Sequence, residues 1–133
     1  MKKVKVRAFL DNNNALDFEV DGVKAQHARL KLDKGSGTQP IDFDLRDQSG
    51  RGLMFNQDDP IWVDEDGPCP PTPGISSDQL SVTGCTADRL SAVNANSGRS
   101  RELRYQLNFI AADGSRSNCD PIIQNGGGGG GTQ

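Results

Sequence analysis

Residues 101–111 carry the longest run of alternating apolar and polar side chains in the chain. Five apolar residues occupy every second position: Leu103, Tyr105, Leu107, Phe109 and Ala111. Successive side chains of a strand point to opposite faces, so these five form one buried face. With this phase, Leu107 points into the core and Asn108 points toward solvent.

A turn and a return strand follow this run. Asp113-Gly114 comes directly after it, and an Asp-Gly pair suits the positive φ angles of a two-residue type I′ turn. The chain then returns through Cys119 and Ile122-Ile123. We therefore predict a β-hairpin over residues 101–125 and expect it at the centre of a β-sheet.

Shorter alternating runs recur along the rest of the chain, broken by Gly, Pro, Asn and Asp. They predict strands over residues 2–10, 16–20, 28–32, 41–45, 53–55, 61–63, 80–82 and 90–93. No stretch has apolar residues at helical spacing over three turns. Short strands at near-regular intervals are typical of an antiparallel sandwich or barrel.

The length of 133 residues fits one domain, which we place at residues 1–125. Six glycines and Thr132-Gln133 follow Asn125. Glycine has no side chain to bury and a large entropy cost of ordering, so residues 126–133 are expected to form a flexible tail.

The charge pattern bears on partners and location. The net charge is −3, and the 15 basic residues are spread without a cluster that would hold a phosphate backbone, which argues against nucleic acid. No segment is suited to span a membrane. Met1-Lys2-Lys3 resembles a signal-peptide start, but no apolar core follows. We expect a cytoplasmic protein; the alternatives are export without a classical signal, or a mature form with an added Met.

The three cysteines are Cys69, Cys85 and Cys119, and no two have the CxxC spacing of a zinc site. Cys69 opens a proline-rich loop and Cys119 lies near the end, so a disulfide between them would staple the loop to the last strand. An odd number of cysteines without a signal peptide favours free thiols in a reducing compartment.

The late part of the chain carries a resemblance to a known fold family. Residues 94–98, then 103–107, then Asp113-Gly114 and a final strand resemble the F–G hairpin of immunoglobulin-like sandwiches. The resemblance covers about the last quarter of the chain and implies that Tyr105 stands at the family's corner tyrosine. Leu107 replaces the family's second cysteine, and no Cys-Trp-Cys spacing exists. The fold class expected is all-β, an immunoglobulin-like antiparallel β-sandwich of seven to nine strands.

The cupredoxin sandwich is a near neighbour of this fold. Its copper site needs two histidines, a cysteine and usually a methionine, whereas this chain has one histidine, His27. The resemblance therefore does not imply electron transfer. The pattern as a whole resembles small bacterial sandwich proteins of uncharacterised function.

No signature of catalysis accompanies the polar residues. His27 shares strand parity with Arg29 and Lys31, which indicates an exposed strand histidine, and no nucleophile motif is present. Several carboxylates alternate with core residues and read as outer-face charge that meets Lys or Arg across the sheet: Asp17, Glu19, Asp21, Asp42 and Asp44. We expect no enzyme activity and no cofactor.

Two sets of loop residues are candidates for binding. Clustered carboxylates suit calcium, and the candidates are Asp11, Asp58, Asp59, Asp64 and Asp66. Asp is also common in solvated turns, which is the favoured interpretation. The candidates for binding a partner are Trp62, Pro70 and Pro71, beside the long irregular segment 64–78. Trp62 either lies outside as an anchor or packs beneath this loop as core; its bulk favours the core.

Three functional hypotheses follow in order of preference. The first is a non-catalytic module for protein interaction or self-assembly, in which a last strand at a sheet edge pairs with a partner or a second copy. The alternative is a binding domain for calcium or a small ligand. An enzyme is the third.

Overall fold

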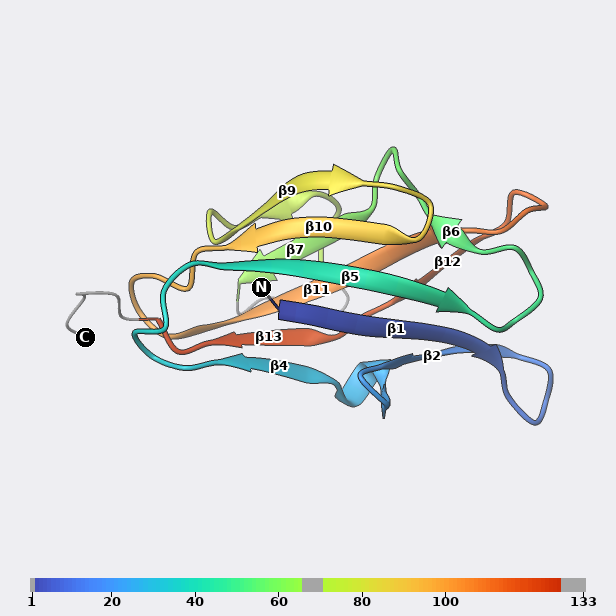
Figure 1. The fold of residues 1–133 in the computed structure, drawn as a ribbon, viewed down its shortest axis with the longest axis horizontal. Coiled ribbons are helices and arrows are strands. Elements are labelled where there is room, and N and C mark those ends of the chain that lie inside the picture. Colours follow the sequence, from blue (N-terminus) through green and yellow to red (C-terminus); the bar gives the residue numbers. More distant parts are fainter. Residues whose placement is uncertain (1, 66–70, 128–133) are drawn as a thin grey trace.

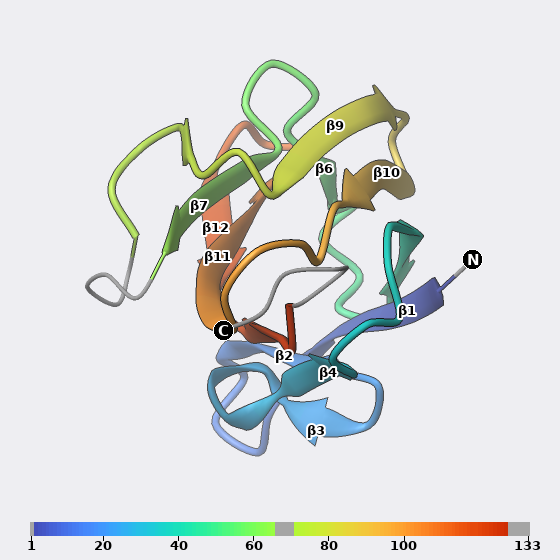
Figure 2. The ribbon, with the colours of Figure 1, turned by 90° about the vertical axis from the view of Figure 1, so that its left-hand side faces the viewer.

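The computed structural model describes residues 2–65 and 71–127, which form strands and one short 3₁₀ helix, η1 (Ala25–His27). Two sheets face each other and enclose a single hydrophobic core (Figures 1 and 2). The first sheet has the order β3 (Val23–Lys24), β2 (Leu16–Val20), β1 (Lys2–Leu10), β5 (Gln39–Asp47), β10 (Arg89–Asn94) and β9 (Leu80–Cys85). The second has the order β4 (Arg29–Leu32), β13 (Ile122–Asn125), β11 (Arg101–Ile110), β7 (Ile61–Glu65) and β8 (Ile75–Ser76). Two further strands, β12 (Arg116–Cys119) and β6 (Met54–Phe55), also pair with β11.

The all-β prediction is confirmed, but the sheets are mixed rather than antiparallel. β1 pairs in parallel with β5, β13 with β4, and β7 with β8. The first of these pairs arises because the chain leaves the first sheet after β3, crosses through η1 to β4 in the second sheet, and returns as β5. The described residues contain 13 strands rather than seven to nine, since two-residue strands carry no alternation that the sequence displays.

The predicted hairpin is confirmed at the centre of the second sheet. The first half of β11 pairs with β13 and β7, and its second half pairs with β12 and β6. The predicted two-residue turn is wrong. The amide of Ala111 donates to Ser115 O at 2.8 Å, and Gly114 alone in this turn has a positive φ, at 88°. This geometry is that of a longer turn that places its glycine in the left-handed region.

Aromatic rings join the inner face of β11 to the first sheet. Phe109 stacks on Phe18 of β2 with ring centroids 5.0 Å apart and lies 5.1 Å from Phe55 of β6. Tyr105 lies 5.6 Å from Phe43 of β5 and is 1% exposed. Tyr105 is therefore a central core residue, packed between the two sheets.

The outer face of the first sheet carries paired charges, as its alternation predicts. Arg7 of β1 contacts Glu19 of β2 at 3.2 Å, and Arg89 of β10 contacts Asp44 of β5 at 2.9 Å. Asp42 accepts a hydrogen bond from the Ser91 hydroxyl at 2.8 Å. Glu19 and Asp44 thus face cations across a partly solvated face. Asp42 is buried, and its partner is the Ser91 hydroxyl.

Asn108 points outward from the second sheet but is buried, contrary to the sequence-based expectation of a solvent-facing residue. Its side chain is 8% exposed because the β6–β7 loop folds over it. The Asn108 amide donates to Asp59 O at 2.9 Å, and its oxygen accepts from Gln106 Nε2 at 2.6 Å. This position therefore needs both a donor and an acceptor.

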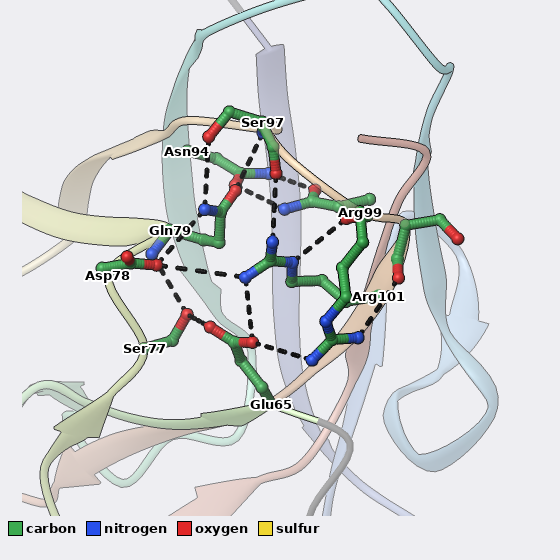
Figure 3. A network of polar contacts seen from close by, with 10 residues as sticks. Glu65, Ser77, Asp78, Gln79, Asn94, Ser97, Arg99 and Arg101 are labelled. Carbon is green, nitrogen blue, oxygen red and sulfur yellow. Dashed lines mark hydrogen bonds and ion pairs between the residues drawn. The ribbon is translucent and has the colours of Figure 1, made fainter. Parts of the chain in front are cut away.

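A polar network closes one end of the molecule (Figure 3). Asn94 of β10 and Asn125 of β13 exchange two hydrogen bonds of 2.7 and 2.9 Å and so tie the two sheets together. Arg101 of β11 contacts Glu65 of β7 at 3.0 Å, and both side chains are less than one-fifth exposed, at 12% and 19%. Gln79 binds the backbone amide of Ser97 at 2.9 Å. Buried polar groups are thereby satisfied where the sheets end.

The first two glycines after β13 belong to this closed end. The amide of Gly126 donates to Leu32 O at 2.7 Å, and that of Gly127 donates to Asn96 Oδ1 at 2.9 Å. Gly127 has a φ of 74°, and a Cβ there would lie 2.5 Å from Gly98 O. The packed part of the chain thus continues through Gly127, two residues past the predicted domain boundary.

The orientation of the side chains on β11 and β12 predicts that three Asp substitutions differ in how much they lower the free energy of unfolding. Leu107→Asp is expected to leave no folded protein, because an unpaired carboxylate in the core costs several kcal/mol of a total of about 5–15 kcal/mol. Asn108→Asp removes the donor to Asp59 O and should cost about 1–3 kcal/mol. Asn118→Asp, an exposed outer-face control, should stay within about 0.5 kcal/mol. Urea unfolding followed by circular dichroism measures all three; equal losses for Asn108→Asp and Asn118→Asp would contradict the buried position of Asn108.

The fit of Gly127 predicts that Gly127→Ala is markedly destabilising. The left-handed backbone costs about 1–3 kcal/mol for a non-glycine residue, and the new methyl group overlaps the Gly98 carbonyl in addition. Gly114→Ala is the matched control, because its φ is 88° but nothing lies within 4 Å of the added Cβ. Thermal unfolding of both variants should show the larger loss at Gly127, and a loss no larger than that at Gly114 would mean that the closed end does not constrain Gly127.

Candidate functional site

β9 is the outermost strand of the first sheet on the side away from β3. Within the described chain it pairs with β10 alone, so its second side is unpaired. Four consecutive residues of β9 are exposed: Ser81, Val82, Thr83 and Gly84. A free strand edge presents N–H and C=O groups that another strand can pair with.

The other strands with a free side in the described residues are protected in ways that β9 is not. β3, β6 and β8 are two residues long. β4 exposes Arg29 and Lys31, and β12 exposes Arg116. β9 has six residues without a charge or a proline. Short length and charged side chains discourage strand pairing at an edge, so β9 is the edge best suited to accept a strand.

A bulge in β9 determines which of its side chains face the other sheet. Val82 pairs with Ala92 and Gly84 pairs with Ser91, so Thr83 is an extra residue. The extra residue shifts the alternation by one position. Val82 and Cys85 consequently share the inner side of the strand with Leu80.

An open groove of about 550 Å³ lies beside β9, where the second sheet does not cover this strand. The second sheet ends on this side in the two-residue β8, which is too short to shield the inner side of β9. Ile75 of β8 and Val82 of β9 line the groove and are 43% and 37% exposed. Two of the four large apolar residues that the described chain exposes therefore meet in one groove.

The groove has an acidic end and no basic lining residue. Asp58 and Asp59 of the β6–β7 loop line it and are exposed. The amide of Phe55 donates to Ala87 O at 2.8 Å, which places this loop beside the end of β9 at Cys85. Asp59 also accepts the indole N–H of Trp62 at 2.9 Å. The Cys85 end of the groove thus attracts positive charge.

The described thiols are suited to packing rather than to chemistry. Burial raises the pKa of Cys85, which lines the groove, and burial likewise raises the pKa of Cys119 well above its usual range. A protonated thiol is a weak nucleophile. Cys119 lies in the core, while Cys69 lies outside the described residues, so the disulfide between them stays a prediction.

The described calcium candidates are distributed over the β1–β2 turn, the β6–β7 loop and strand β7. Asp11 accepts the amides of Asn13 and Ala15 in the β1–β2 turn at 2.8 and 3.0 Å. Asp64 accepts the amide of Thr72 at 2.7 Å and its hydroxyl. Asp58 and Asp59 lie at the groove, and Asp66 is outside the described residues. Over residues 2–65 and 71–127 no three His, Cys, Asp or Glu side chains gather to hold a metal.

The favoured interpretation of Trp62 as a core residue is wrong. Ile61 and Val63 are in the core, so Trp62 points to the outer face of the second sheet, where it is half-buried. Pro71 is buried, and Pro70 lies outside the described residues. His27 is exposed in η1 rather than in a strand. Among the described candidates, Trp62, Pro71 and His27 do not line the groove beside β9.

A second cavity, of about 350 Å³, lies between β2, η1 and β12. Two of its lining residues, Ser117 and Asp120, each have a buried side-chain oxygen without a hydrogen-bond partner in the described structure. Burial raises the pKa of the Asp120 carboxyl. This cavity is polar and is the second candidate for a binding site.

Sequence reasoning missed both sites, although one signal was present. The segment 80–85 lacks charge and proline, which is unusual for an edge strand, but sequence does not show that β9 is at an edge. Comparison with known proteins finds no matching family model and no matching curated sequence. Among the residues that the structure describes, no helix has the length and apolar character needed to cross a membrane.

Proposed function

We propose that the chain is a non-catalytic protein-interaction module that binds an extended segment of a partner by pairing it with β9. The observation that carries the proposal is the unprotected β9 edge beside an open apolar groove. In this mode of recognition, main-chain hydrogen bonds supply affinity and pockets for alternate side chains supply specificity.

The energetics of the groove favour a strand as the ligand. A bound strand satisfies the free main-chain groups of β9 and covers Ile75 and Val82. Removing the remaining exposed surface of these two side chains contributes on the order of 1 kcal/mol each. Their exposure of 43% and 37% is thus a cost to the free protein that binding removes.

The proposal extends to the fold family and to the cellular location. We propose an immunoglobulin-like sandwich, which the facing sheets support, with three parallel pairs added to the antiparallel pattern. We propose a cytoplasmic location, with export without a classical signal as the alternative. The free thiol of Cys85 fits a reducing compartment.

A charged residue on β9 should abolish binding. We expect Val82→Lys to remove a strand partner, because lysine on an edge strand opposes pairing and fills the groove with charge. Val23→Lys is the matched control, since Val23 is a valine of the opposite edge strand, β3, and is 47% exposed. Affinity capture from lysate and sedimentation velocity of the full chain measure a foreign partner and a second copy, respectively. A partner retained by Val82→Lys, or lost equally in both variants, would contradict binding at β9.

The second candidate function is small-ligand binding in the cavity between β2 and β12. The orphan oxygens of Ser117 and Asp120 support it, because a ligand that donates hydrogen bonds would complete both. A thermal-shift screen of small amines and amides should then give ligands that raise the melting temperature of the wild type but not of Asp120→Asn. Ligands that stabilise both proteins equally would place binding elsewhere.

A further inference from the structure

We infer that the segment bound at β9 runs antiparallel to it and carries a basic residue at its N-terminal end, followed by alternating apolar residues. The inference rests on the proposed function and adds the chemistry and direction of the partner. It follows from the different character of the two ends of the groove.

The end of the groove near Cys85 carries unbalanced negative charge. Asp58 and Asp59 line it, and the lining includes no Lys or Arg. Asp58 is exposed, and its carboxylate has no hydrogen-bond or ion-pair partner in the described structure. A cation placed here gains attraction without the loss of an existing partner.

The polar and charged side chains near the Leu80 end of β9 already have partners within the protein. Gln79 precedes it and binds the Ser97 backbone. The nearby Arg101 is paired with Glu65 at 3.0 Å (Figure 3). A charged residue of the partner therefore gains more at the Cys85 end than at this one.

The direction follows from strand geometry. Antiparallel pairs are somewhat more stable per residue than parallel pairs. β9 runs from Leu80 to Cys85, so an antiparallel partner begins beside Cys85 and ends beside Leu80. Its N-terminal residues then meet Asp58, which places the basic residue at that end.

The side chains of the partner are divided between two environments. Alternate residues point to the inner side, where they cover Val82 and Ile75 and should be apolar. The residues between them extend the outer face beside Ser81 and Gly84, which is exposed, and should be polar. The partner is therefore an amphipathic strand with a cationic start.

Two peptides of equal composition test the inference. The first is acetyl-Lys-Lys-Val-Thr-Val-Thr-Val-amide, and the second is acetyl-Val-Thr-Val-Thr-Val-Lys-Lys-amide. Isothermal titration calorimetry with the full chain should show the first binding about threefold to tenfold more tightly, as expected for exposed ion pairs. The preference should disappear at high salt. It should become smaller in Asp58→Asn, which leaves Asp59 as the only carboxylate among the described lining residues. Asp33→Asn, an exposed carboxylate outside the groove, is the control and should keep the preference.

The thiol of Cys85 gives an independent measure of where the peptide lies. Cys85 lines the groove, so the first peptide should slow its alkylation by iodoacetamide, read by peptide mass spectrometry. Equal affinity of the two peptides with Cys85 protected would overturn the charge and direction inferred here and leave binding at β9 standing. Tighter binding of the second peptide would indicate a parallel partner. Failure of both peptides to bind and to protect Cys85 would overturn strand addition itself.

Discussion

The rest of the structure depends on the burial of one face of β11. This strand is the longest of the second sheet and pairs with four others, so its position sets the register of β6, β7, β12 and β13. Its inner side chains also hold the two sheets together, through Phe109 on Phe18 and Tyr105 against Phe43. With an apolar content of 33%, the chain concentrates its aromatic burial at this one contact between the sheets.

The core between the sheets is covered to different extents on different sides of the molecule. On one side, the chain itself crosses between the sheets from β3 through η1 to β4. At one end, the Asn94–Asn125 pair and the ion pair of Arg101 with Glu65 supply partners for groups that lose water. On the β9 side, the connection from β8 is short and β8 has only two residues, so the inner side of β9 is left uncovered. The groove thus follows from the shortness of β8.

The sequence predicts the strands that are long enough to alternate, and it fails where alternation is absent or does not decide the environment. β1, β2 and β11 were located because each buries one face over five or more residues. β3 and β8 are too short to show a period. The phase placed Asn108 correctly on the outer face but gave no sign that residues 56–60 cover it. Trp62 has the bulk of a core residue, yet it alternates with the buried Ile61 and Val63 along the strand, and this alternation directs it outward.

The candidate site was harder to predict than the fold because it depends on strand order. Residues 80–85 carry no charge. This is ordinary for a strand inside a sheet, whereas an edge strand usually carries charged side chains that oppose pairing. The missing charge is therefore informative only when the strand order is known. β4 and β9 differ in the charge of their exposed side chains. Both strands end a sheet, but β4 exposes Arg29 and Lys31 whereas β9 exposes Ser81, Val82, Thr83 and Gly84. A chain with 25% charged residues had charge available for this edge, as β4 and β12 show. The uncharged β9, with Val82 and the neighbouring Ile75 exposed beside it, is thus the observation on which the proposed strand addition rests.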